Sequence, residues 1–143
     1  MTTVSYERGP ADVGFSSRYS RMVTELERSV NLDDIDDVVR LDLARAFVHV
    51  TVLRAHVLRD LSDRGEGAQP GPEASITKLL ATRTEQHLHH VAMDLAGSEP
   101  LVGGRPEVLS EYLYSRAASI AGGTSEIQRA IIAERILHLP RGD

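Results

Sequence analysis

The sequence predicts an all-α fold, an antiparallel bundle of the four-helix type, for a chain of 143 residues. Apolar residues recur every three or four positions over long stretches, which is the spacing of one helix face. Clusters of glycine and proline interrupt these stretches and mark the loops between helices. A chain of this length can bury roughly two thirds of its unfolded surface in one core. We therefore expect four or five helices, no sheet and a single domain over residues 1–143.

The first two helices are expected near Ser5–Val30 and from Ile35 to Leu61. Four aspartates at the amino end of the second helix complement the helix dipole: Asp33, Asp34, Asp36 and Asp37. One apolar stripe follows this helix, through Val39, Leu43, Ala46, Val50, Leu53, Val57 and Leu61. A second stripe is expected to widen its buried face, through Val38, Phe47, Val52 and Leu58.

Three further segments complete the expected bundle. The loop Gly65–Pro72 leads into a third helix that runs to about Leu95 and stops at Gly97. Its expected buried face consists of Ile76, Leu79, Leu80, Leu88, Val91 and Leu95. A shorter helix is expected over Val108–Ala121. The last helix should begin at Thr124 or Ser125, with Ser125 and Gln128 as a capping box, and run toward His138.

Composition excludes several classes of function. The net charge is −5, from 16 basic and 21 acidic residues, and the basic residues are scattered, which argues against nucleic acid as a partner. There is no cysteine, and hence no disulfide, thiolate nucleophile or cysteine-ligated zinc. No apolar run approaches the ~20 residues that cross a bilayer. We expect a soluble, cytoplasmic protein that does not act at a membrane.

The segment Glu85-Gln-His-Leu-His-His90 superficially resembles a metal site. Glu85 with His89, and Gln86 with His90, are neighbours four residues apart, but the two pairs point from different sides of a helix. A divalent metal needs three or more converging ligands, so we expect no metal here. The alternative is a polar helix face on which Gln86 and His90 meet water, a partner chain or cofactor atoms.

The segment Ile120-Ala-Gly-Gly-Thr-Ser-Glu-Ile-Gln-Arg129 joins a glycine turn to a clear helix start. Adjacent glycines allow positive φ angles and let a ligand approach bare backbone. The helix start leaves main-chain N–H groups facing outward. Taken by itself, such a segment is typical of an ordinary loop-to-helix junction.

The longer string from Tyr112 to Arg141 closely resembles the carboxyl-terminal signature of flavin-dependent acyl-CoA dehydrogenases. Gly71–Leu80 resembles a helix start in the actinobacterial branch of that family, and Tyr6-Glu-Arg-Gly9 resembles the helix that opens its last domain. The resemblance covers nearly the whole chain. It nevertheless corresponds to one third of such an enzyme, because the amino-terminal helical domain and the middle β-domain have no counterpart here.

The resemblance implies a reaction in which a carboxylate removes the α-proton of an acyl-CoA while FAD accepts a hydride from the β-carbon. Family members often carry the base where this chain has Gly122, which has no proton acceptor. In others the base lies on the first helix of the domain, a place matched by Glu7; the alternative for Glu7 is a surface glutamate paired with Arg8 or with the amino end of the helix. The resemblance also implies that Thr124 and Glu126 contact the flavin dinucleotide, with the main chain of Gly123 and Ser125 beside the thioester and flavin.

Glu126 in the first helical turn would repel phosphate, so we assign this turn to hydroxyls and ring edges of the cofactor. Two family patterns that support FAD binding are absent: Arg-x-x-Phe-Gly near Asn31–Val39, and Gly-Gly-Asn-Gly, in whose place stands Leu95-Ala-Gly-Ser98.

Three functions remain open. The chain is the last helical domain of an acyl-CoA dehydrogenase, used with a partner chain that carries the missing domains or cut from a longer protein. Alternatively it is a non-catalytic oligomerisation or scaffold module, or a stand-alone binder of acyl-CoA. In the first case we expect the isolated chain to be inactive and colourless. In any case we expect a homodimer or homotetramer, because a bundle without its covering domains leaves apolar surface.

Overall fold

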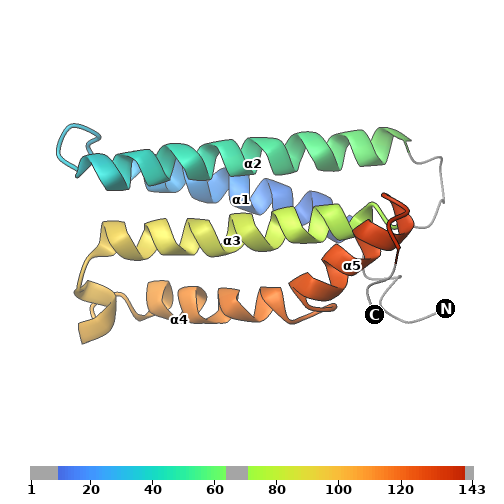
Figure 1. The fold of residues 1–143 in the computed structure, drawn as a ribbon. Coiled ribbons are helices and arrows are strands. Elements are labelled where there is room, and N and C mark those ends of the chain that lie inside the picture. The colour runs from blue at the N-terminus through green and yellow to red at the C-terminus, as the bar shows by residue number, and fades with distance from the viewer. Residues whose placement is uncertain (1–9, 64–70, 141–143) are drawn as a thin grey trace.

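The computed structural model describes residues 10–63 and 71–140, and these are helical, with no strand among them. Five α-helices follow one another: α1 (Pro10–Arg28), α2 (Asp37–Asp63), α3 (Ala74–Ala96), α4 (Pro106–Ser115) and α5 (Ser125–Arg135) (Figure 1). Two short 3-10 helices lie between them, η2 (Glu99–Val102) and η3 (Arg116–Ser119). The predicted all-α class is confirmed. The first residues of the expected opening helix, 5–9, lie outside the described part of the chain.

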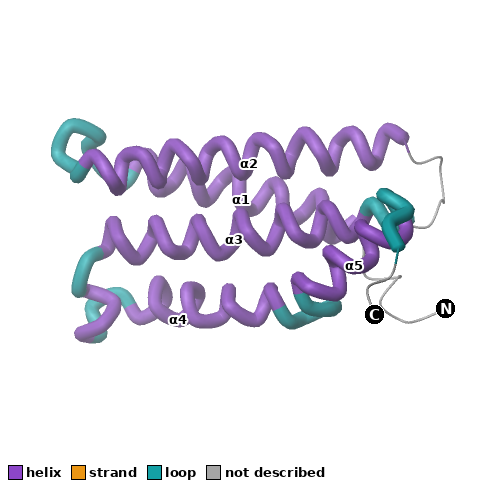
Figure 2. Tube along the Cα trace, in the orientation of Figure 1, coloured by secondary structure: helices purple, strands orange, loops and turns teal. Residues whose placement is uncertain are grey.

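Helix α3 is the centre of the bundle, because it contacts α1, α2, α4 and α5. Figure 2 shows α2, α3 and α4 running side by side, with α5 turning across the end where α3 begins. The core lies where α1, α2 and α3 meet. It is built from Tyr19, Val23, Leu43, Ala46, Val50, Leu53, Val57, Leu88 and Val91.

Helix α2 confirms the middle of one of its two predicted stripes, while at the ends of that stripe Val39 is half-buried and Leu61 is 39% exposed. Leu43, Ala46, Val50, Leu53 and Val57 are buried, and the Asp36 carboxylate accepts the Val38 N–H at 2.7 Å, which fixes the helix start. The prediction that the second stripe joins the core is wrong, because its four members are between 48% and 65% exposed. Both partner helices, α1 and α3, lie on one side of α2, so its remaining apolar residues face outward.

Helix α3 begins and ends close to prediction and stops at Gly97, whose φ is 61°. Its burial differs from the prediction, however. Ile76, Leu79, Leu80 and Leu95 are half-buried, whereas the polar residues Ser75, Thr77, Thr82, Thr84 and His89 are buried. A helix with neighbours on several sides has covered positions outside its apolar stripe, and periodicity alone does not reveal them.

The fourth and fifth helices are shorter than predicted. The α-helical part of the expected 108–121 segment ends at Ser115, and η3 follows as a separate turn. Helix α5 ends at Arg135, before His138, where the backbone has a positive φ of 53°. None of the helices in the described ranges combines the length and apolar character that a membrane span requires.

Candidate functional site

The glycine turn that follows η3 has two adjacent residues in the positive-φ region. Gly122 has φ 66° and Gly123 has φ 97°. Thr124 is the N-cap of α5, with extended backbone and a hydroxyl that accepts the Ile127 N–H at 3.4 Å. The capping box predicted for Ser125 and Gln128 is therefore wrong. The helix begins one residue earlier than that motif requires, and the side chain of Gln128 points toward the glycine turn.

Gln128 is only 1% exposed and closes the turn from within. Its Nε2 donates to the carbonyl oxygen of Gly122 at 3.0 Å. A Cβ at Gly123 would lie 2.8 Å from the same nitrogen. Position 123 thus requires glycine for two reasons, which are its positive backbone angle and the amide packed against it.

Three side chains of α3 hold the irregular segment 115–123 against the bundle. Lys78 donates from Nζ to the Gly123 carbonyl at 2.6 Å, and Thr82 donates from Oγ1 to the Ala118 carbonyl at 3.2 Å. Gln86 donates from Nε2 to the Ser115 carbonyl, also at 3.2 Å. These three residues are spaced four apart and therefore share one face of α3.

This polar face was not identified from the sequence. The available signal was the four-residue spacing of Lys78, Thr82 and Gln86, together with the fact that Lys78 is the only lysine in the chain. We define the three side chains as the α3 clamp. The clamp satisfies carbonyls that the helical pattern leaves open after α4 ends.

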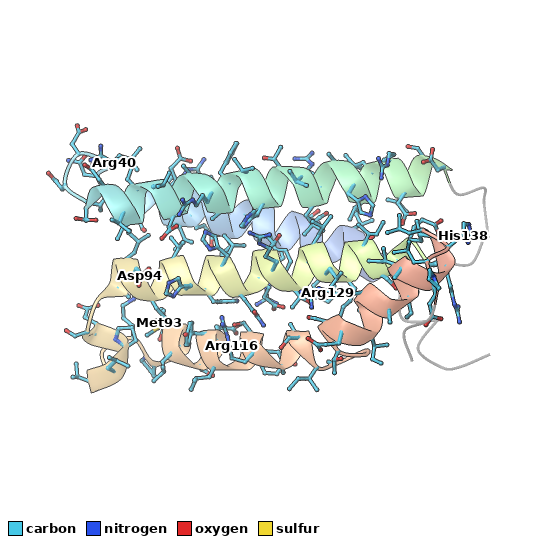
Figure 3. All side chains as sticks on the ribbon, in the orientation of Figure 1. Arg40, Met93, Asp94, Arg116, Arg129 and His138 are labelled. Atoms are coloured by element: carbon cyan, nitrogen blue, oxygen red, sulfur yellow. The ribbon has the colours of Figure 1, made fainter. Side chains whose placement is uncertain are left out.

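A cavity of about 530 Å³ lies beside the turn, between α3 and α5. Its polar lining consists of Thr82, Arg83, Gln86, Ser119, Ser125 and Arg129. Figure 3 places Arg129 on α5 where that helix passes α3. Two guanidinium groups and several hydroxyls can bind the phosphate, hydroxyl or carbonyl oxygens of a polar ligand.

The four predicted cofactor residues are contiguous but point to different places. Ser125 lines the cavity. The carbonyl of Gly123 accepts a hydrogen bond from Lys78, and Thr124 is the N-cap of α5. Glu126 is exposed, and hydrogen bonds from its own backbone N–H and from the Thr124 hydroxyl lower its pKa. The start of α5 therefore already carries an anion. The candidate base Glu7 lies outside the described residues.

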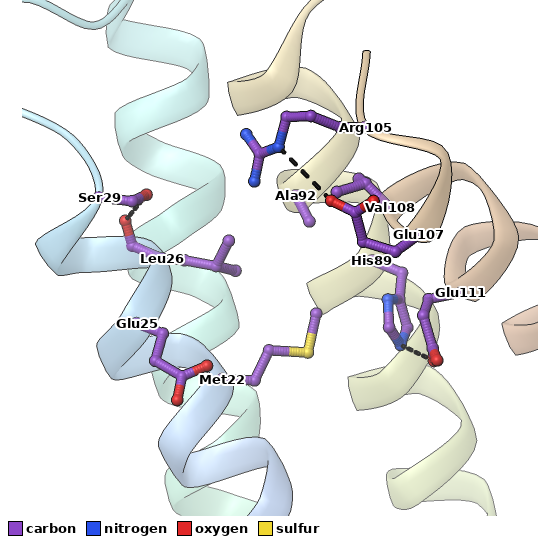
Figure 4. Close-up of a pocket in the computed structure, with 10 residues that line it drawn as sticks. All are labelled: Met22, Glu25, Leu26, Ser29, His89, Ala92, Arg105, Glu107, Val108 and Glu111. Carbon is purple, nitrogen blue, oxygen red and sulfur yellow. Dashed lines mark hydrogen bonds and ion pairs between the residues drawn. The ribbon is translucent and has the colours of Figure 1, made fainter. Parts of the chain in front are cut away.

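A second cavity, of about 300 Å³, lies between α1, α3 and α4 (Figure 4). Met22, Leu26, Ala92 and Val108 supply apolar surface, and charged side chains surround them: Glu25, Arg105, Glu107 and Glu111. His89 borders this cavity and is 4% exposed; its Nε2 lies 4.0 Å from the Glu111 carboxylate and has no hydrogen-bond partner in the described structure. Burial lowers the pKa of His89, and the Glu111 carboxylate partly opposes that shift.

The buried Tyr19 of α1 meets the half-buried Glu85, which lies one turn of α3 before His89. Tyr19 and Glu85 are hydrogen-bonded, and burial is the main cause that raises the pKa of both groups. The charge of Arg18 opposes the shift in each case. Because Arg18 also forms an ion pair with Glu111 at 3.0 Å, these groups link α1, α3 and α4.

The histidine segment does not converge on a metal position. His87 is 2.9 Å from the carbonyl of Asp42 on α2, His89 faces α4, and His90 pairs with Asp94 at 3.6 Å. In the described ranges no three histidine, aspartate or glutamate side chains form a group that could hold a metal ion. Gln86, expected to meet water, a partner chain or cofactor atoms, donates to the Ser115 carbonyl within the chain and also lines the cavity between α3 and α5.

Comparison with known proteins gives consistent matches. The family model described as "Acyl-CoA dehydrogenase, C-terminal domain" matches residues 34–137. Acyl-CoA dehydrogenase IpdE1 of Mycolicibacterium smegmatis is 35% identical over 147 residues, a match that spans 99% of this chain and 36% of that protein. The homologous IpdE1 of Mycobacterium tuberculosis is also 35% identical, and the chain spans 37% of it.

Two solved structures share the fold. A variant of the Tcur3481-Tcur3483 steroid ACAD superposes with a TM-score of 0.73 at 20% identity, covering 97% of this chain and 39% of that one. The ChsE4-ChsE5 complex from Mycobacterium tuberculosis superposes with a TM-score of 0.65 at 26% identity, covering 90% and 36%. In sequence and in structure, the chain spans well under half the length of the proteins it matches.

Proposed function

The chain belongs to the acyl-CoA dehydrogenase family, to whose C-terminal domain it corresponds, and we propose that it is the helical domain of a flavin-dependent enzyme completed by a partner chain. The partner would carry the amino-terminal helical domain and the β-domain that the family resemblance implies, since the chain spans only 36% of the length of IpdE1 from Mycolicibacterium smegmatis. The proposed reaction is α,β-dehydrogenation of an acyl-CoA thioester in the cytoplasm. The steroid ACAD and the two-component ChsE4-ChsE5 complex among its structural neighbours support both the reaction class and the divided assembly.

The clamped glycine turn is the observation that carries the proposal. Lys78 and Gln128 bind the carbonyls of Gly123 and Gly122, and Thr82 and Gln86 bind carbonyls of the segment that precedes them, so a partner domain would meet a rigid edge. Rigid placement of the reacting groups is what such chemistry requires. In the adjacent cavity, Arg83 and Ser125 face the same space as Arg129, which also forms an exposed ion pair with Glu126 at 3.6 Å.

The residues beside the turn fit the polar part of FAD. Arg83 and Arg129 would bind anionic or carbonyl oxygens, and Ser119 and Ser125 would bind hydroxyls. FAD, when bound, supplies the acceptor for the hydride of the substrate β-carbon. The chain's own contribution is to bind and orient the cofactor edge and to exclude water from it.

The proton acceptor does not come from the turn in this proposal. Gly122 occupies the place of the common base and carries no side chain, so the base is Glu7 or a carboxylate of the partner chain. A general base must reach the α-proton and have a pKa near the working pH, which a closed interface between the two chains would favour.

Flavin binding tests the proposal directly. The purified chain should be colourless, whereas co-expression with a neighbouring gene that encodes the missing domains should give a yellow complex with acyl-CoA dehydrogenase activity. Arg129→Ala should lower the flavin content of that complex, and Arg21→Ala, an exposed change on α1, should not. A stoichiometric yellow preparation of the chain alone would mean that the cofactor site is misplaced.

The alternative is a scaffold module that has kept the bundle and lost the chemistry. The glycine at the place of the common base favours it. In that case the complex would form without flavin, and the partner chain would have equal activity with and without this domain. Either result would reject the proposed catalytic role.

A further inference from the structure

The cavity between α1, α3 and α4 is bordered by a buried polar atom that has no partner (Figure 4). The side chain of His89 is only 5% exposed, and its Nε2 makes no hydrogen bond within the described part of the chain. The carboxylate oxygen of Glu111 is 4.0 Å away, which is beyond hydrogen-bond length. Buried polar atoms in native proteins nearly always have a partner. The cavity therefore offers a ligand one hydrogen-bonding position beside apolar surface.

The charged groups around this cavity compensate one another, with one exception. Glu111 is paired with Arg18 at 3.0 Å. Glu107 is paired with Arg105 at 4.0 Å. The carboxylate of Glu25 also lines the cavity, and no ion pair among the residues that the structure describes includes it. One negative charge is thus left over, which favours a cation and disfavours a phosphate or carboxylate.

Apolar side chains supply the rest of the lining. Met22 and Leu26 come from α1, and Ala92 and Val108 come from α3 and α4. Figure 4 shows Met22 and Leu26 extending from α1 toward the space that His89 borders. With a volume of about 300 Å³, the cavity is at the small end of the ligand pockets found in proteins. A fitting ligand is therefore small and mostly apolar, with a single polar group directed at Nε2.

We propose that this cavity binds a small organic ammonium ion with an apolar body, of the arylalkylamine class. The ammonium group donates an N–H to His89 Nε2 and lies near the Glu25 carboxylate, while the apolar body packs on the α1 side chains. A hydroxyl would satisfy the nitrogen but not the charge, and a carboxylate would be repelled. Burial lowers the pKa of His89, so the ring is neutral at about pH 7 and retains a nitrogen that accepts.

The proposed site is independent of the dehydrogenase function. The residues that line it and those that line the cavity beside the glycine turn have no member in common. Loss of flavin binding would therefore leave this proposal intact, and the reverse also holds.

Titration of the 143-residue chain with phenethylammonium, followed by amide NMR, tests both affinity and location. The dissociation constant should be on the order of 1 mM, as expected for a ligand of this size. The signals of His89, Ala92 and Val108 should shift. Phenethyl alcohol, which has the same shape without the charge, should bind about tenfold more weakly, and phenylacetate should not bind. Equal affinity for the ammonium and the alcohol, no binding of either, or shifts confined to α5 and the glycine turn would overturn the proposal.

A matched pair of variants separates this site from general attraction of a cation to an acidic chain. Glu25→Gln and Glu27→Gln each remove one charge from the exposed surface of α1, but only Glu25 lines the cavity. Glu25→Gln should weaken phenethylammonium binding by about three- to tenfold, and Glu27→Gln by less than about twofold. Equal effects of the two changes would show that net charge alone attracts the ligand.

Two interior changes test the hydrogen bond and the volume. His89→Phe keeps a ring but removes the accepting nitrogen, and Ala92→Leu places a larger side chain in the cavity. Each should lower the affinity by about tenfold or more, with unchanged helical circular dichroism. Full affinity in either folded variant would reject the site; if both variants are unfolded, the comparison of Glu25→Gln with Glu27→Gln decides.

Discussion

Replacing Gly123 by alanine should destabilise the protein more than replacing any of the other positive-φ glycines whose surroundings are open. Two costs contribute to the lost free energy of unfolding. A residue with a Cβ at a positive φ costs about 1–2 kcal/mol, and here φ is 97°. The new Cβ would also lie 2.8 Å from Gln128 Nε2. Moving that buried amide breaks its 3.0 Å hydrogen bond to the Gly122 carbonyl, and loss of a hydrogen bond by a buried group costs about 1–3 kcal/mol.

The expected total is about 3 kcal/mol, against about 1.5 kcal/mol for Gly103→Ala. Gly103 is the matched control, because its φ of 85° is similar and no atom lies within 4 Å of the place that an added Cβ would occupy. With a urea m-value of about 2 kcal/mol/M, the unfolding midpoints should fall by about 1.5 M and 0.7 M, respectively.

Chemical unfolding followed by circular dichroism measures both changes. Gln128→Ala adds a further check, since the Gly123→Ala penalty should be smaller in a chain that lacks the amide. Equal destabilisation by Gly123→Ala and Gly103→Ala would show that the close approach of Gln128 does not constrain the turn, and the account of a rigid edge would fail.

Four further changes probe the site and its surroundings. Lys78→Met should leave the Gly123 carbonyl with only the 3.5 Å hydrogen bond from Gln128 Nε2 and lower stability by about 1–3 kcal/mol. Amide exchange in the turn that follows η3 should become faster; unchanged exchange would contradict the clamp. Burial lowers the pKa of His89 below its ordinary value of 6.5. As the pH falls below 6.5, His89 therefore binds a proton in the unfolded chain but not in the folded chain. Stability should therefore decrease from about pH 7.5 to 5.5, and His89→Gln should lessen the decrease in urea titrations; an unaltered slope would exclude His89 as a source. Burial raises the pKa of Glu85, so folding disfavours the ionised form of this side chain. Glu85→Gln should therefore stabilise the protein more at about pH 7 than near pH 4.5. The opposite order in the same urea titrations would refute the raised pKa. If Glu7 is the proton acceptor of an assembled enzyme that contains this domain, Glu7→Gln should keep acyl-CoA binding and lose most turnover, and adding Gly122→Glu should then restore part of the turnover. Turnover close to that of the parent would place the base elsewhere.

The sequence alone determined the fold class and the order of the helices. The core stripe of α2 could be read from periodicity because it depends only on local geometry, and the same holds for the stops at Gly97 and at the glycine turn. The string from Tyr112 to Arg141 was specific enough to identify the family, which the match over residues 34–137 confirms. The roles of Gly123, Thr124, Ser125 and Glu126 toward FAD remain predictions.

Tertiary structure decided which apolar and polar faces are covered. Periodicity places Val52 and Leu58 on an apolar face, but it cannot tell that α1 and α3 both lie on the other side of α2. It likewise predicts one helix over 108–121, whereas Thr82 and Gln86 bind carbonyls of that segment where η3 replaces the α-helix. These outcomes depend on contacts between residues that lie about 30 positions apart in the chain. The local sequence cannot encode which distant group will donate a hydrogen bond to a given carbonyl.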